Sequence, residues 1–188
     1  FLPSNRQVVP AHLWAVRCPG TIVSRGNATY AMIMSDKLFH LQAWTPQVLE
    51  VAQNVMRDIQ RITPELEVLF MGAAALKLPG KNDIDLDILC AADDVPSYTK
   101  KLIAVLGKPE EELPHQTAWE FTQDGFEIDC ILSDPSISHV PLQKRRFELL
   151  QSNPQLLEAY KQLKIACDGL PYEQYEKRKI AFLEKLSS

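Results

Sequence analysis

One octapeptide constrains the fold more than any other part of the chain: Asn82-Asp83-Ile84-Asp85-Leu86-Asp87-Ile88-Leu89, with an aspartate at every second position. Successive side chains of a β-strand point to opposite faces of a sheet. The pattern therefore predicts a strand that has Asp83, Asp85 and Asp87 on one face and large aliphatic side chains on the other. The apolar face would hold the carboxylates in rigid positions.

Three carboxylates on one face of a strand repel one another, so usually one of them is protonated or a cation bridges them. Carboxylate oxygens are the ligands of hard divalent cations such as Mg²⁺, which often share them with the phosphates of a substrate. A solvated acidic face is the alternative reading of the same pattern. Asp87 is expected at the solvent-exposed exit of the strand, and not as a ligand.

The composition is that of an ordinary globular protein and sets limits on function. The 188 residues are 46% hydrophobic and 23% charged, which is enough for one domain with a sizeable core. The net charge of −4 argues against a broad nucleic-acid-binding surface. Four scattered cysteines predict free thiols in a reducing, cytoplasmic location, and no apolar run approaches the length of a membrane span.

The remaining patterns predict alternating helices and strands. Thr45-Pro46 would begin a helix that ends at Thr63-Pro64, and Asp93 or Asp94 would begin another that ends at Gly107. Asp124-Gly125 is a strong two-residue hairpin signal. The expected strands are 67–71, the aspartate strand, 119–122 and 126–132, and the expected C-terminal helices fill 142–188 with a cap at Asn153-Pro154.

These elements give an α+β fold: a small mixed β-sheet flanked by helices, followed by a helical C-terminal part. We expect residues 41–188 to form one domain. Residues 1–40 lack periodicity and are expected to form an N-terminal extension, with a short hairpin around Arg25-Gly26-Asn27 as one possibility.

Three segments, taken in order, resemble the nucleotidyltransferase superfamily. Its pattern is an apolar residue before Gly-Ser or Gly-Gly, then about ten residues, then a strand with two alternating aspartates, then a third acidic strand. Met71-Gly72-Ala73 matches the first part, Asp83-Ile84-Asp85-Leu86 the second, and Phe126-Glu127-Ile128-Asp129-Cys130 is well placed for the third.

Within that superfamily the chain resembles the GrpB family of predicted nucleotidyltransferases over roughly residues 39–186. Trp44 lies 28 residues before Gly72, as an early tryptophan does in that family, and Leu78-Pro79-Gly80-Lys81 resembles its Pro-Gly loop and lysine. Its tail spacing is matched by Asn153-Pro154, Tyr160, Lys164, Tyr175, Lys179, Phe182 and Leu183.

The resemblance implies a nucleotidyltransferase-like fold and a mechanism. Asp83 and Asp85 would ligate Mg²⁺ (or Mn²⁺), which would hold a nucleoside triphosphate, and Asp129 would complete the metal site. Asp129 is preferred to Glu127 because it lies deeper in the apolar run. The Gly72-Ala73 turn and Lys81 would contact the phosphates. The acceptor could be a small molecule, a protein or RNA, and no membrane partner is expected.

One departure from the family pattern leaves an alternative open. Ala73 stands where the family usually has serine, whose hydroxyl helps to bind the phosphates. A hydrogen bond to a charged group is worth roughly 1.5–3 kcal/mol, so its loss would weaken nucleotide binding by about ten- to a hundredfold. The alternative is a non-catalytic module that binds nucleotides or regulates a partner, as antitoxin members of the superfamily do.

Overall fold

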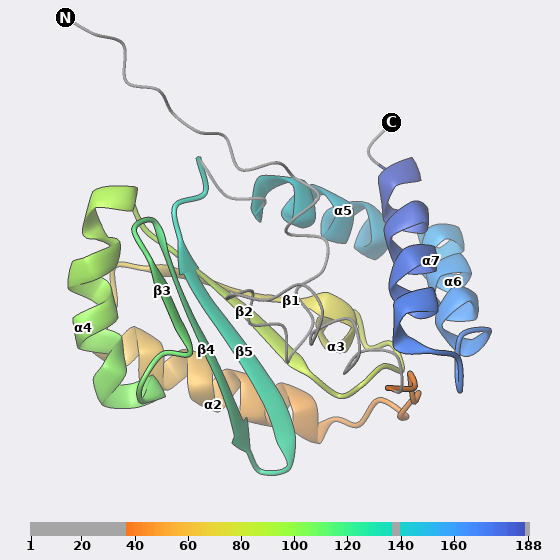
Figure 1. Ribbon diagram of the computed structural model, residues 1–188, viewed down its shortest axis with the longest axis horizontal. Helices are drawn as coiled ribbons and strands as arrows, with labels where there is room; N and C mark the ends of the chain where they lie inside the picture. The colour runs from red at the N-terminus through yellow and green to blue at the C-terminus, as the bar shows by residue number, and fades with distance from the viewer. Residues whose placement is uncertain (1–36, 137–139, 187–188) are drawn as a thin grey trace, which may run out of the picture.

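The computed structural model describes residues 37–136 and 140–186, which form a mixed sheet with helices packed around it (Figure 1). Its elements follow in the order α2 (Gln47–Ile62), β1 (Glu67–Met71), α3 (Gly72–Ala75), β2 (Ile84–Leu89), η2 (Ala92–Asp94), α4 (Val95–Leu106), β3 (Glu111–Leu113), β4 (Gln116–Gln123), β5 (Phe126–Ser133), α5 (Val140–Ser152), α6 (Pro154–Ile165) and α7 (Tyr172–Lys185).

The five strands lie in the order β1-β2-β5-β4-β3. Strands β2 and β5 are parallel, whereas the other three pairings are antiparallel, so the sheet is mixed. The predicted α+β class, with a small mixed sheet, flanking helices and a helical C-terminal part, is confirmed. The parallel pair in the middle places the aspartate strand directly beside the second strand of the predicted hairpin.

The apolar face of β2 forms the main core. Ile84, Leu86 and Ile88 are at most 1% exposed, and they pack in one cluster with residues of α2 and α4. Figure 1 shows α4 on one side of the sheet and helices α5, α6 and α7 together on the opposite side. Because α2 and α4 cover the aliphatic face, the aspartates face the other way, as the alternation of the strand requires.

Two local signals produce the structures that they predict. Asp124 and Gly125 have φ angles of 51° and 85° and connect β4 to β5, as a tight hairpin turn requires. The Asn153 side chain accepts hydrogen bonds from the backbone N–H groups of Gln155 and Leu156, and so caps α6. Strand β3, in contrast, is too short and polar to have been predicted.

Of two predicted helix starts, one is wrong and one is confirmed in position. Helix α2 begins at Gln47, and no side chain caps it; the Thr45 carbonyl accepts from the Val48 N–H instead. Asp94 directly precedes α4, as predicted, but its side chain makes no capping bond, and a short 3₁₀ turn, η2, comes before the helix. Gly107 ends α4, as predicted, with a φ of 79°.

Residues 37–42 pack against the rest of the fold, although the sequence assigns residues up to 40 to an extension. Phe39 is 1% exposed and stacks on Tyr175, with 3.8 Å between ring centroids. Its backbone exchanges hydrogen bonds with the α6–α7 turn at Gly169 and Leu170. The possible hairpin around residue 26 lies outside the described residues. None of the described helices is long and apolar enough to span a bilayer.

Candidate functional site

Asp85 of β2 and Asp129 of β5 are register partners on adjacent parallel strands, and they point to the same face of the sheet. The Oδ1 atom of Asp129 is buried and has no hydrogen-bond partner among the described residues. Glu127, the other candidate on β5, is exposed. Two carboxylates 44 residues apart in the sequence are thus brought together by strand pairing.

Asp83 lies one residue before β2 and is paired with a lysine. The Lys81 Nζ lies 2.8 Å from Asp83 Oδ2, and both side chains are largely buried, 16% and 14% exposed. Gln42 anchors the loop that carries Lys81. The Gln42 N–H donates a hydrogen bond to the Gly80 carbonyl, and the Gly80 N–H donates one to the Gln42 carbonyl. Asp83 therefore has a cation partner already, in contrast to the orphan oxygen on Asp129.

The surroundings of the three carboxyl groups shift their pKa values in different directions. Burial, reinforced by the Asp83 charge, raises the pKa of Asp85 to about 6. Burial and the Asp85 carboxylate raise the pKa of Asp129 to about 8. Burial also tends to raise the pKa of Asp83. The charge and the hydrogen bond of Lys81 outweigh this effect, so the pKa of Asp83 is lowered. The cluster thus holds ionised and protonated carboxyls side by side.

Asp87 is not at a solvent-exposed exit, and that prediction is wrong. It is 5% exposed, and burial followed by the Asp85 charge raises its pKa to about 7. Its neighbours across the sheet are Leu69 on β1 and Ile131 on β5, so apolar side chains flank it. Strand alternation shows which face a residue occupies, whereas its exposure depends on the adjacent strands and whatever covers that face.

Gly72, at the start of α3, touches the acidic strand so closely that only glycine fits. Its φ angle is 75°, and a Cβ at this position would overlap the Asp85 Oδ2 atom. The Trp44 indole N–H donates to the Ala74 carbonyl at 2.9 Å and holds this short helix in place. The small-residue turn therefore lies against the Asp85 carboxylate.

Lys164 of α6 is a buried lysine beside this cluster. It is 3% exposed, and its Nζ donates to the Tyr175 hydroxyl at 3.1 Å. The rings of Phe39, Tyr160 and Tyr175 lie within 6 Å of its Nζ. Burial, followed by repulsion from Lys179, lowers its pKa to about 8, while the charges of Asp83 and Asp85 act in the opposite direction.

Three lysines thus act on the same carboxylates. Lys81, Lys179 and Lys164 each lower the pKa of Asp83 and of Asp85, and Lys179 also lies 3.4 Å from Glu176 Oε1. The sequence predicts Lys81 as a phosphate contact, whereas Lys164 and Lys179 match only the tail spacing of the family. Their helical spacing carries no sign that they face aspartates 79 to 96 residues earlier in the chain.

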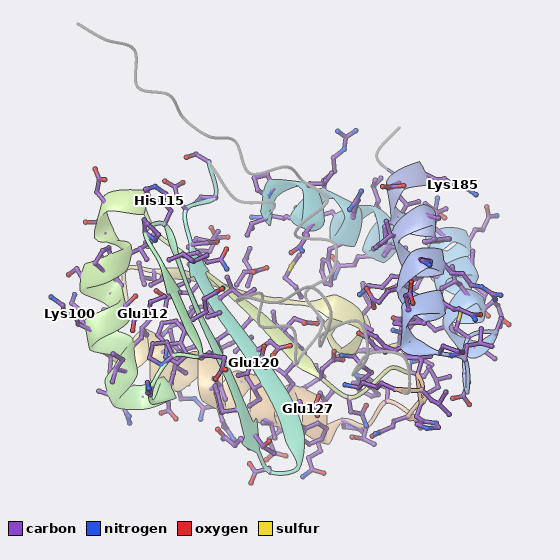
Figure 2. The ribbon with its side chains drawn as sticks, viewed as in Figure 1. Lys100, Glu112, His115, Glu120, Glu127 and Lys185 are labelled. Carbon is purple, nitrogen blue, oxygen red and sulfur yellow. The ribbon has the colours of Figure 1, made fainter. Side chains whose placement is uncertain are left out.

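Other charged residues lie at the edge of this cluster or away from it. Figure 2 shows Glu120 and Glu127 on the β4–β5 hairpin and His115 at the β3–β4 turn. Glu120 is exposed, but it is the register partner of Asp129 and contributes to the rise of its pKa. Lys144 of α5 is 43% exposed and pairs with Glu67 at 3.2 Å.

The donor chemistry of Asp83, Asp85 and Asp129 fits a hard divalent cation. All three supply carboxylate oxygens, and a buried oxygen of Asp129 has no partner. As the side chains are placed, however, no group of three His, Cys, Asp or Glu residues in the described ranges has the spacing of a metal site. Lys81 lies against one of the three carboxylates. The three aspartates therefore have the ligand chemistry that a divalent cation prefers, but their side chains must rearrange before they can bind it.

No family model matches the sequence. A UPF0157 protein of Vibrio cholerae is 26% identical to the chain over 141 residues, which cover 69% of this chain and 70% of that protein. At this level the two sequences are distant relatives.

Similar solved structures include the Cid1 poly(U) polymerase bound to MgATP (16% identity, TM-score 0.45, 73% of this chain), a cytoplasmic RNA terminal U-transferase (19%, 0.45, 72%) and polymerase beta of Leishmania infantum (11%, 0.42, 77%). The chain spans 46%, 43% and 54% of those chains, respectively. These values describe a likeness of fold and say nothing about activity.

Proposed function

We propose that this protein is a metal-dependent nucleotidyltransferase of the GrpB-like kind, which transfers a nucleoside monophosphate from a nucleoside triphosphate to an acceptor hydroxyl. One observation carries the proposal: Asp83 and Asp85 lie within the electrostatic influence of three lysines from the loop and the C-terminal helices, and Asp129 is the register partner of Asp85. A carboxylate cluster suits a cation, and a lysine cluster suits the polyphosphate that the cation accompanies.

The acidic residues have distinct roles in this proposal. Asp83, Asp85 and Asp129 hold the cation, which when bound supplies positive charge for the phosphates and for the departing pyrophosphate. Asp129 would also help to deprotonate the acceptor hydroxyl, because the charge of a bound cation would favour the ionised form of its carboxyl. The acceptor oxygen then forms a bond to the α-phosphorus, and the bond to pyrophosphate breaks.

The lysines bind and orient the phosphates. Lys164 is desolvated by its aromatic surroundings, and its pKa near 8 shows that the charged form lacks full compensation there. A polyphosphate would supply the missing negative charge and raise that pKa. Lys179 on the next helix and Lys81 on the Pro-Gly loop approach from other directions, so the three ammonium groups together suit a polyanion.

The second candidate function is a nucleotide-binding module without turnover. Ala73 favours it, because the turn beside Asp85 lacks the hydroxyl that the family pattern provides. The other features of the site, which are the glycine turn and the lysines, would serve nucleotide binding as well as they would serve catalysis. The two functions differ in one measurable property, which is the release of pyrophosphate.

The test is the thermal stability of the protein with ATP, GTP, CTP or UTP, in the presence and absence of Mg²⁺ or Mn²⁺. A ligand that binds only the folded state stabilises it by about 2.7 kcal/mol at a hundred times its dissociation constant. We expect a metal-dependent shift that Asp85→Asn removes. Asp124→Asn is the matched control, because Asp124 lies in the exposed hairpin turn, where asparagine is tolerated.

Pyrophosphate release with candidate acceptors then separates the two functions. Turnover that requires Asp85 and Asp129 supports the transferase. Nucleotide binding without turnover, for any small-molecule, protein or RNA acceptor, favours the module. No stabilisation by any nucleotide at millimolar concentration would contradict both.

A further inference from the structure

Lys81 and Asp83 form an ion pair inside the proposed metal site. Their charged atoms are 2.8 Å apart, and both side chains are less than one fifth exposed. A metal ion and the Lys81 ammonium would therefore compete for the same oxygen atoms.

The backbone around this pair is fixed, so only the side chains are free to rearrange. Gly80, which precedes Lys81, exchanges two backbone hydrogen bonds with Gln42, at 2.7 and 3.0 Å. The Asn82 side chain donates to the Gln42 side chain at 3.1 Å, and the Asn82 backbone has a φ of 59°. A lysine side chain has a flexible four-carbon stem, so its ammonium can move while this loop stays in place.

The other lysines mark where the ammonium would go. Lys81 Nζ lies 5.7 Å from the centroid of the Tyr172 ring, which belongs to the same aromatic cluster as Tyr175. Tyr175 is the residue to which Lys164 donates its hydrogen bond. A polyphosphate held by Lys164 and Lys179 would offer oxygens within the reach of Lys81 on that side.

We propose that Lys81 is an exchangeable internal cation: it neutralises Asp83 in the metal-free protein and transfers to the phosphates when a metal and a nucleotide bind together. This inference rests on the proposed function. It gives Lys81 two opposite effects. The lysine weakens the binding of a metal alone, because it competes for Asp83, and it strengthens the binding of a metal–nucleotide complex.

The test measures Mn²⁺ binding without nucleotide, by electron paramagnetic resonance of the free ion, in the wild type and in Lys81→Met. Loss of the competing charge-assisted hydrogen bond should tighten Mn²⁺ binding about tenfold or more. The affinity for a metal–nucleotide complex should change in the opposite direction. Lys81→Arg keeps the charge and should bind Mn²⁺ as the wild type does.

Lys77→Met is the matched control, because Lys77 is an exposed lysine four positions earlier in the chain. It should alter neither affinity. Thermal unfolding of each variant verifies that it is folded, and Lys81→Gln provides a second neutral variant if Lys81→Met is not.

Two results would overturn the inference. If the wild type binds Mn²⁺ and the neutral variants bind it no more tightly, the proposed role of Lys81 is wrong, whereas the proposed metal site is supported. If neither the wild type nor the variants bind Mn²⁺ at millimolar concentration, with or without nucleotide, the proposed function fails together with the exchange.

Discussion

Asp85 and Asp129 pair in register across the parallel strands β2 and β5, and the Asp85 charge raises the pKa of Asp129. Neither residue is near the other in the sequence. Their proximity places two carboxyl groups of raised pKa on one face of the sheet, beside the ion pair of Asp83 with Lys81.

The stability of the metal-free protein should fall as the pH rises from about 4 to about 8. Asp85, Asp87 and Asp129 have folded-state pKa values of about 6, 7 and 8, above the ordinary 3.8, so the folded state binds more protons than the unfolded state in this window. Their stabilising contribution is complete at low pH and is lost as each group ionises.

Between pH 7 and 8, the loss from these three carboxyls should come mainly from Asp129, because it has the highest pKa. Asp129→Asn should therefore flatten the profile there and be more stable than the wild type at pH 8. Urea denaturation midpoints in the presence of a chelator measure this. Asp124→Asn should keep the wild-type slope; an unchanged slope in Asp129→Asn would contradict the assignment.

Gly72→Ala should destabilise the protein more than Gly107→Ala does. Both glycines have a positive φ, 75° and 79°, and the ψ of −162° at Gly107 lies in a region almost restricted to glycine, so each substitution carries a backbone strain of about 1–3 kcal/mol. Only at Gly72 would the added Cβ overlap Asp85 Oδ2, whereas Gly107 has open space. Chemical denaturation compares the two variants, and equal losses would show that the contact with Asp85 has no energetic weight.

Ala73→Ser should strengthen nucleotide binding by about tenfold. A hydroxyl on this turn would add a donor to the phosphates, worth roughly 1.5 kcal/mol or more. The Ala73 Cβ and the Lys164 Nζ both lie 3.5 Å from the position where Gly80 would carry a Cβ, so the hydroxyl would enter the region of the lysines. Titration with the preferred nucleotide measures the effect, with Ala75→Ser on the same short helix as the control.

An unchanged affinity in Ala73→Ser would show that the serine of the family pattern does not act at this position. The comparison with Ala75→Ser separates that outcome from a general effect of serine on α3.

Lys164→Met should raise stability at pH 7 and weaken nucleotide binding. The folded-state pKa of Lys164 is about 8 against an ordinary 10.5, so burying the charge costs the folded state up to about 3 kcal/mol. The cost disappears as the pH rises from about 8 to 10.5, because the unfolded state binds more protons there. The stability difference between the variant and the wild type should therefore shrink over that range.

Lys161→Met on the same helix is the control, since Lys161 is 40% exposed and its ammonium lies 3.7 Å from Glu158 Oε2 on the helix surface. It should change neither stability nor affinity by a measurable amount. A Lys164→Met variant that loses stability and keeps its nucleotide affinity would mean that the buried lysine has a structural role alone.

The sequence by itself determined the local geometry. The alternation of Asp83, Asp85 and Asp87 with aliphatic residues defines the two faces of β2, because strand geometry has a period of two. The Asp124-Gly125 turn and the Asn153 cap depend on backbone preferences within a few residues. The α+β class follows from such local signals taken in order.

Only the tertiary structure decided which distant residues meet. Strand pairing sets Asp129 beside Asp85, and helix packing brings Lys164 and Lys179 to the same carboxylates. Burial of Asp87 and Phe39 likewise depends on what other elements cover them. Exposure, pKa and charge neutralisation are set by neighbours in space, and periodicity along one strand or helix carries no information about those neighbours.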